Sequence, residues 1–162
     1  MSVLVACIGN IFQGDDAFGC EVAKELARKS LPTDVRVVDF GIRGLDLTYA
    51  LLDAPDLTIL VDTVSRGGEP GTLYTIEPSV DDETADASRR TLNTHAMDPA
   101  EVLRAAKEMG GALKRILLVG CEPADLGGEC GRMGLTQPVS EAIPYAAEIV
   151  EALIQKEQQV QQ

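Results

Sequence analysis

The fold of this chain is indicated by its opening stretch, Val3-Leu4-Val5-Ala6-Cys7-Ile8, which runs into Gly9-Asn10-Ile11-Phe12-Gln13-Gly14-Asp15-Asp16. Six apolar residues in succession predict a buried strand. Beyond the loop, three apolar residues recur at four-residue spacing and predict a helix over about residues 17–30: Phe18, Val22 and Leu26. A strand, a sharp turn and a helix in this order are the first unit of an α/β fold.

Strands and helices continue to alternate along the rest of the chain. The pattern predicts strands over about residues 34–39, 57–62, 71–76 and 115–119, and helices over about 44–54, 99–109 and 138–155. Residues 78–94 are polar and acidic, which predicts an exposed loop. This order predicts a three-layer α/β/α sandwich with a mostly parallel, roughly five-stranded twisted sheet. We expect one domain over residues 1–156 and a frayed, Gln-rich tail over residues 157–162.

Composition excludes several classes of partner. The chain has 162 residues and a formal net charge of −12, and its sequence pI is near 4.4. An acidic protein lacks the basic face that nucleic-acid phosphates or an anionic membrane surface require. The first residues show no charged segment followed by a long apolar core, which argues against a signal peptide. We therefore expect a cytoplasmic protein, and we expect a monomer because no long exposed apolar stripe is evident.

Four residues are candidates for a functional site because each lies at or beyond the end of a predicted strand or in a loop before a helix. They are Asp16, Asp39, Asp62 and the single histidine of the chain, His95. In an open α/β sheet, strand ends and the loops after them converge on one crevice where ligands bind. Carboxylates and an imidazole that converge there suit a divalent transition metal.

Each candidate also has an ordinary structural interpretation. Asp15 or Asp16 could cap the first helix, and with two acids one can cap while Asp16 faces the crevice. Asp39 and Asp62 could end their strands and bind loop amides, which is common. A lone histidine such as His95 is more often a surface or core residue than a ligand.

Other templates fit the sequence poorly. Gly9 and Gly14 match the opening of a phosphate-binding loop, but Asp15 and Asp16 follow where that loop needs Lys and Ser or Thr, and two carboxylates would repel phosphate. The chain has no G-x-S-x-G elbow, no H-E-x-x-H helix motif and no C-x-x-C pair. Cys121 and Cys130 could be soft metal ligands, although unpaired thiols are the simpler interpretation.

Taken together, the segments resemble the hydrogenase maturation endopeptidases. The residues Gly9 to Gly19 resemble that family's opening signature, G-N-x4-D-[DE]-x-x-G. The similarity continues through further segments and spans residues 3 to about 154: Asp39-Phe40-Gly41 with Gly44, Leu60-Val61-Asp62-Thr63-Val64, Pro70-Gly71-Thr72, His95, Asp98 to Leu103, Val119-Gly120-Cys121-Glu122-Pro123 and Gly134-Leu135-Thr136.

The resemblance implies an activity and a set of site residues. Members of the family cut a short C-terminal extension from the large-subunit precursor of NiFe hydrogenases after nickel has been delivered to it. The three metal-binding positions fall on Asp16, Asp62 and His95. Asp16 is one methylene shorter than the Glu that is frequent there. A family motif linked to the cleavage step falls on Asp39 and Gly41.

The implied catalytic residues are Asp16, Asp39 and Asp62. The metal would be nickel carried by the substrate, and zinc or cadmium could occupy the same ligands in vitro. The peptide bond would be cut by water that is either polarised by metal or deprotonated by a carboxylate, the latter as in an aspartyl protease. The alternative is a non-enzymatic nickel-binding maturation chaperone on the same fold.

Overall fold

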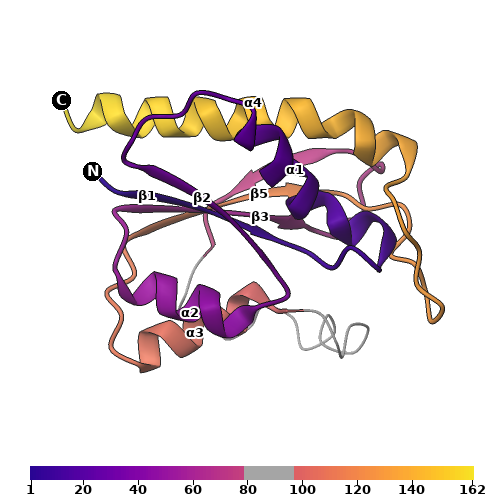
Figure 1. Cartoon of the computed structure of the whole chain (residues 1–162), viewed down its shortest axis with the longest axis horizontal. Coiled ribbons are helices and arrows are strands. Elements are labelled where there is room, and N and C mark those ends of the chain that lie inside the picture. The colour runs from indigo at the N-terminus through magenta and orange to yellow at the C-terminus, as the bar shows by residue number, and fades with distance from the viewer. Residues whose placement is uncertain (79–96) are drawn as a thin grey trace.

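The computed structural model describes residues 1–78 and 97–162 (Figure 1). The elements follow the predicted order, with a short 3-10 turn added before the first helix. Their bounds are β1 Val3–Ile8, η1 Gly14–Ala17, α1 Phe18–Ala27, β2 Val35–Gly41, α2 Gly44–Leu52, β3 Leu57–Thr63, β4 Leu73–Ile76, α3 Pro99–Glu108, β5 Arg115–Cys121 and α4 Gln137–Val160.

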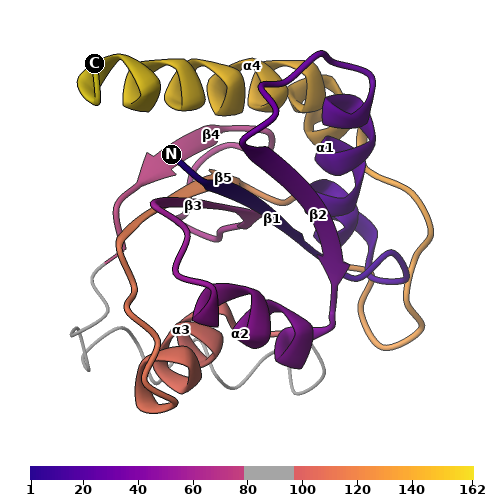
Figure 2. The same cartoon turned by 60° about the vertical axis from the view of Figure 1, so that its left-hand side comes forward.

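The sheet has five strands in the order β2-β1-β3-β5-β4. β1 pairs in parallel with β2 and β3, and β3 pairs in parallel with β5, whereas β4 lies antiparallel to β5 at one edge. Figure 2 shows α1 and α4 on one face of this sheet and α2 and α3 on the other. The predicted α/β/α sandwich with a mostly parallel five-stranded sheet is confirmed.

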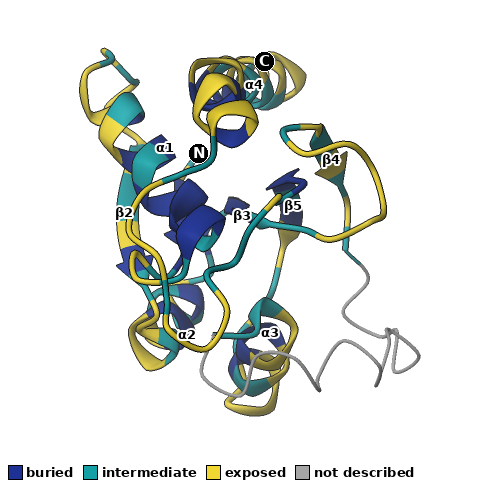
Figure 3. Cartoon of the chain, turned by 90° about the vertical axis from the view of Figure 1, so that its right-hand side faces the viewer, coloured by how far each residue is buried: buried dark blue, intermediate teal, exposed yellow. Residues whose placement is uncertain are grey.

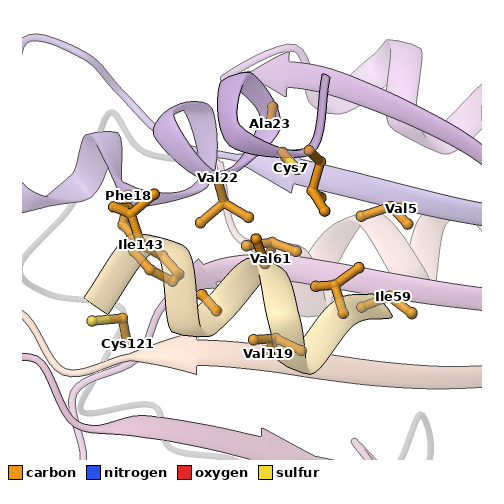
Figure 4. Packing of buried hydrophobic residues seen from close by; sticks show 14 of the residues in the cluster. Val5, Cys7, Phe18, Val22, Ala23, Ile59, Val61, Val119, Cys121 and Ile143 are labelled. Carbon is orange, nitrogen blue, oxygen red and sulfur yellow. The ribbon is translucent and has the colours of Figure 1, made fainter. Parts of the chain in front are cut away.

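Alternate residues of the central strands fill two separate cores. Val5, Cys7, Ile59 and Val61 point to the face covered by α1 and α4, where they pack around Phe18 and other apolar side chains (Figure 4). Residues of opposite parity, such as Leu4, Ala6 and Leu60, pack against α2 and α3. The central strands β1 and β3 are therefore buried on both faces, which explains their nearly continuous apolar sequences.

Helix α1 begins against the ends of the two central strands. A Cβ at Gly19 would lie 2.1 Å from the carbonyl oxygen of Ile8 and 2.6 Å from that of Val61, so only glycine permits this approach. Since β1 and β3 run in parallel, their carboxyl ends lie at one edge of the sheet. The close packing at Gly19 brings the loop before α1 to the same edge.

Two details of the helices bear on the predictions. Asp98 is the N-cap of α3, where its side chain accepts a hydrogen bond from the Ala100 amide, and Pro99 follows at the first turn, as expected. Helix α4 is longer than the sequence suggested, because it continues through part of the segment expected to fray. Glu157 forms an ion pair with Arg115, and Gln158 donates to Asp34, so these residues are held against the sheet.

Some predictions lie outside the described residues. Most of the loop predicted for residues 78–94, from residue 79 onward, belongs to this part, and so does His95. Among the helices that the structure describes, none combines the length and apolarity needed to cross a bilayer.

Candidate active site

The carboxyl end of the parallel sheet carries two of the predicted acids. Figure 3 views the molecule from this end. Asp16 belongs to η1, in the loop between β1 and α1, and Asp62 lies near the end of β3. Asp16 is partly exposed, whereas the Asp62 side chain is nearly buried. Two segments separated by more than forty residues are thus brought to one edge.

Thr63 connects the two acids. Its backbone amide donates to Asp62 Oδ1 at 2.8 Å, and its hydroxyl donates to Asp16 Oδ1 at 3.1 Å. The other oxygen of Asp16 accepts a hydrogen bond of 3.0 Å from the Asn10 amide. The Thr63 residue therefore fixes the position of both carboxylates, a role that the sequence analysis missed. Its place directly after Asp62 is the one signal that pointed to it.

The environment of this pair disfavours negative charge. Burial raises the pKa of Asp62 well above its ordinary value of 3.8, and the charges of Asp16 and Asp98 raise it further, against the Thr63 amide, which lowers it. Burial also raises the pKa of Asp16, although hydrogen bonds from Asn10 and Thr63 oppose the rise. Two carboxylates close together in a partly buried site repel each other, so the pair can hold a proton or a cation.

Asp39 lies in a different setting. It pairs with Cys7 in the sheet, and Cys7 points into the α1 side of the core, whereas Asp62 follows Val61 and points toward the α2 side. The exposed Asp39 carboxylate accepts a hydrogen bond from the Gly41 amide at 3.0 Å. Gly41 has a positive φ of 56°, a conformation that favours glycine. The predicted acid–glycine motif therefore forms a tight turn at the end of β2.

The third predicted metal ligand, His95, lies outside the described residues, so the structure gives no position for the imidazole. Within residues 1–78 and 97–162, no group of three His, Cys, Asp or Glu side chains is arranged to hold a metal ion. The described part of the chain supplies the two carboxylates of the predicted triad.

Asp15 does not have the role that the sequence suggested. Helix α1 has Ala17 at its N-cap and no side-chain capping bond, so the expectation that Asp15 or Asp16 caps it is wrong. Both acids lie within the short η1 turn, ahead of the first residue of the helix. Asp15 is instead fully buried, and its carboxylate accepts hydrogen bonds from Ala124, Asp125 and Thr136.

Glu122 is a second buried acid with a structural role, and the sequence analysis did not assign it one. Its carboxylate accepts hydrogen bonds from the amides of Arg66 and Gly67, at 2.8 and 3.0 Å, and from the Tyr74 hydroxyl at 3.1 Å. These contacts hold the loop that follows β3. The position of Glu122 directly after β5 was the available signal, but the identity of its partners was not.

The four cysteines form no disulfide bond, and Cys7, Cys20 and Cys121 are buried. Burial, and to a lesser extent neighbouring acids, raises the pKa of both Cys20 and Cys121 to about 12, so these thiols stay protonated. Cys130 is exposed in the loop before α4.

Several known proteins are similar to this chain in sequence. Residues 20–153 match the family model described as hydrogenase maturation protease. The hydrogenase 2 maturation protease of Escherichia coli is 30% identical over 157 residues, covering 96% of this chain and 92% of that protein. The hydrogenase expression/formation protein HupD of Bradyrhizobium diazoefficiens is 35% identical over 143 residues, covering 87% of this chain and 71% of that protein.

A solved structure also has this fold. The hydrogenase maturating endopeptidase HybD from E. coli superimposes with a TM-score of 0.75 at 29% identity, covering 97% of this chain and 94% of that one. Sequence and fold thus agree over nearly the whole length. The chain belongs to the hydrogenase maturation protease family and is an endopeptidase.

Proposed function

We propose that this endopeptidase removes the C-terminal extension of the large subunit of a NiFe hydrogenase after nickel insertion, and that it recognises nickel already held by its substrate. We further propose that it acts as a cytoplasmic monomer. The observation that carries the proposal is the coupled pair Asp16 and Asp62, which lies where the ends of β1 and β3 meet.

The electrostatics of this pair favour a cation. Each ionised acid raises the free energy of the other, and burial adds to the cost. A divalent ion that approaches the pair removes this repulsion. Oxygen ligands together with the imidazole of His95 suit nickel or zinc, and three protein ligands leave positions open for donors from a partner. Substrate-borne nickel would then report that the large subunit is ready to be cut.

The same residues can assist hydrolysis. A carboxylate whose pKa is raised above its ordinary value is a better proton acceptor for water than an ordinary carboxylate. Asp62 has this property, and Thr63 holds it in a defined orientation. Water would attack the scissile carbonyl, and its proton would pass to a carboxylate. Metal polarisation of the same carbonyl is the second route that the ligand set allows.

Exposed apolar side chains from three loops at the carboxyl edge support a protein-sized substrate. They are Ile11, Phe12, Ile42 and Met133. Phe12 and Met133 are 61% and 66% exposed and line a hollow between their two loops. We infer that the large-subunit precursor contacts this rim. Phe12→Ala should raise the KM for the precursor by about tenfold and leave kcat unchanged, since the rim binds but does not react.

The nickel requirement is tested with two forms of the large-subunit precursor, one without nickel and one loaded with it. Each is incubated with protease that has been stripped of metal by a chelator. Cleavage of the nickel-loaded form alone supports the proposal, and equal cleavage of both forms contradicts it. Nickel added to the protease before the metal-free precursor is the control, and it should not restore cleavage.

A second experiment separates cleavage from nickel binding without cleavage, the chaperone alternative. Asp39→Asn keeps the shape of the side chain at the end of β2 and removes its charge. We expect this variant to lose processing while it still binds metal. Unchanged maturation of the precursor would favour a chaperone, although membership in a protease family argues against that role.

A further inference from the structure

The segment after β5 holds a role that the proposed function leaves unexplained. This segment, residues 122–136, contains none of the proposed catalytic acids, yet it supplies the donors around the carboxylate of Asp15. Asp15 Oδ2 accepts from the amides of Ala124 and Asp125 at 2.8 and 3.0 Å, and Oδ1 accepts from the Thr136 amide at 2.7 Å. The Thr136 hydroxyl lies within 3.0 Å of both oxygens.

These contacts join distant parts of the chain. Asp15 is separated from Ala124 by 109 residues and from Thr136 by 121. Its side chain is fully buried, and both oxygens accept more than one hydrogen bond. A carboxylate saturated in this way has no lone pair directed at a substrate. Its function must therefore be exerted through the segments that it connects.

Backbone hydrogen bonds reinforce the same connection. The Asp15 amide donates to the Asp125 carbonyl at 2.8 Å, and the Gly14 amide donates to the Arg132 carbonyl at 2.8 Å. The Arg132 amide in turn donates to the Phe12 carbonyl at 2.9 Å. A Cβ at Gly14, where φ is 56°, would lie 2.5 Å from the Asp125 carbonyl oxygen. The two loops are therefore in direct backbone contact.

Asp16 is the next residue after this anchor. Its own contacts are few: the Asn10 amide on one oxygen and the Thr63 hydroxyl on the other. The loop from Asn10 to Asp16 would have to move if its attachment to residues 124–136 were lost. The distance between Asp16 and Thr63, and thereby the pairing of Asp16 with Asp62, depends on that attachment.

We propose that Asp15 is a positioning residue, which holds the opening loop against residues 124–136 so that Asp16 faces Thr63 and Asp62. Thr136 is its main partner, because that residue binds the carboxylate through both its amide and its hydroxyl. The expected effect on cleavage rests on the proposed function of Asp16. The structural part of the inference concerns the place of one side chain and can be tested by itself.

The direct test is Asp15→Asn, which keeps the size of the side chain but turns an N–H group toward the donors that surround it. We expect the Asn10 amide, which reports the Asp16 contact, to shift in the NMR spectrum and to exchange faster with solvent. We expect kcat for precursor cleavage to fall by about 100-fold, the loss that a misplacement of about 1 Å can cause.

A stability-matched control separates positioning from general weakening. Ile154 is buried in the core on α4, 18 residues from Thr136 and thus about 27 Å away along the helix. Ile154→Ala should lower the melting temperature and leave the Asn10 amide and kcat unchanged. An Asp15→Asn protein with the same Asn10 signal as the wild type, and with a rate equal to that of Ile154→Ala, would overturn the proposal.

A milder pair of variants decides the matter if Asp15→Asn does not fold. Thr136→Val removes the hydroxyl that bonds to Asp15, whereas Thr136→Ser retains it. We expect the Asn10 amide to move in the Val variant and to return to its wild-type position in the Ser variant. Identical Asn10 signals in the two would contradict the proposal. Wild-type protein that cleaves no precursor would refute the proposed function alone, since the NMR comparison would still stand.

Discussion

Two pairs of acids lie at the carboxyl end of this sheet, and their surroundings differ sharply. Asp15 and Glu122 are buried, and each accepts at least three hydrogen bonds from other segments. Asp62 is also nearly buried, yet within the described residues it accepts one hydrogen bond, from the Thr63 amide. Among donors from residues 1–78 and 97–162, the first pair is saturated with hydrogen bonds and the second is not.

The difference indicates how the fold assigns roles to chemically similar groups. A buried carboxylate that is fully hydrogen-bonded stabilises its connections and has no capacity left for a ligand. A buried carboxylate with few donors and an acidic neighbour has a raised pKa and attracts protons or cations. Burial does not distinguish Asp62 from Asp15 and Glu122, but the number of donors from the described residues does.

The largest effect is expected for an acid with no partners at all. Val22 is fully buried on α1, in the core shared with α4. Val22→Asp places a carboxylate among apolar side chains, where nothing compensates its loss of hydration. We expect the variant to be unfolded by circular dichroism at neutral pH. A folded Val22→Asp protein would show that this core tolerates a carboxylate without hydrogen-bond donors. The number of donors would then not explain the difference between the two pairs of acids.

The next effect concerns the unsaturated pair. Asp62→Asn keeps the side-chain shape and removes the charge beside Asp16. We expect precursor cleavage to fall by roughly a thousandfold, as is typical when a positioned general base is lost. The melting temperature at neutral pH should not fall, because the amide keeps the shape of the side chain and replaces a group whose ionisation burial disfavours. A variant that melts much lower than the wild type would place Asp62 with the structural acids.

The opposite result is expected for the saturated pair. Glu122→Ala leaves the Tyr74 hydroxyl and the amides of Arg66 and Gly67 without their acceptor. The free energy of unfolding should fall by about 2 to 4 kcal/mol, since buried donors without partners are costly. Urea denaturation measures this change. Cleavage by the folded fraction should fall by less than tenfold. A loss of activity as large as that of Asp62→Asn would contradict the distinction between structural and catalytic acids.

The pH dependence of stability offers a smaller effect with a definite sign. The pKa of Asp62 is raised on folding, so its contribution to stability is complete below the ordinary value of 3.8 and is lost as the pH rises through the raised value. With a chelator present, the free energy of unfolding of the wild type should therefore decline as the pH rises from 3.8 through the raised pKa of Asp62, relative to that of Asp62→Asn. Parallel curves for the two proteins would contradict the assignment.

Several features of the fold could be predicted because they are local. The apolar run of β1, the four-residue spacing of α1 and the Asp98-Pro99 start of α3 each encode an element within a few residues. The alternation of such elements predicted the layered α/β fold, which the structure confirms. The longer α4 escaped prediction, because its last turns are held by Arg115 and Asp34 from other elements.

The candidate site was predictable in part. The positions of Asp16 and Asp62 at strand ends pointed to one edge of the sheet, and the structure places both there. The role of Thr63 was not visible, because a hydroxyl after an acid has no distinctive pattern. A helix cap at Asp15 or Asp16 was wrong for another reason. The hydrogen-bond partners of Asp15 lie more than a hundred residues away, where no local pattern can indicate them.

The sequence by itself determined which segments become strands and helices, and that acids follow two central strands, because periodicity and turn residues act over short distances. Only the tertiary structure decided which acids would be saturated with hydrogen bonds and which would be left to repel each other. The physical reason is that a hydrogen bond needs a donor within about 3 Å, and here the donors for Asp15 come from the far end of the chain.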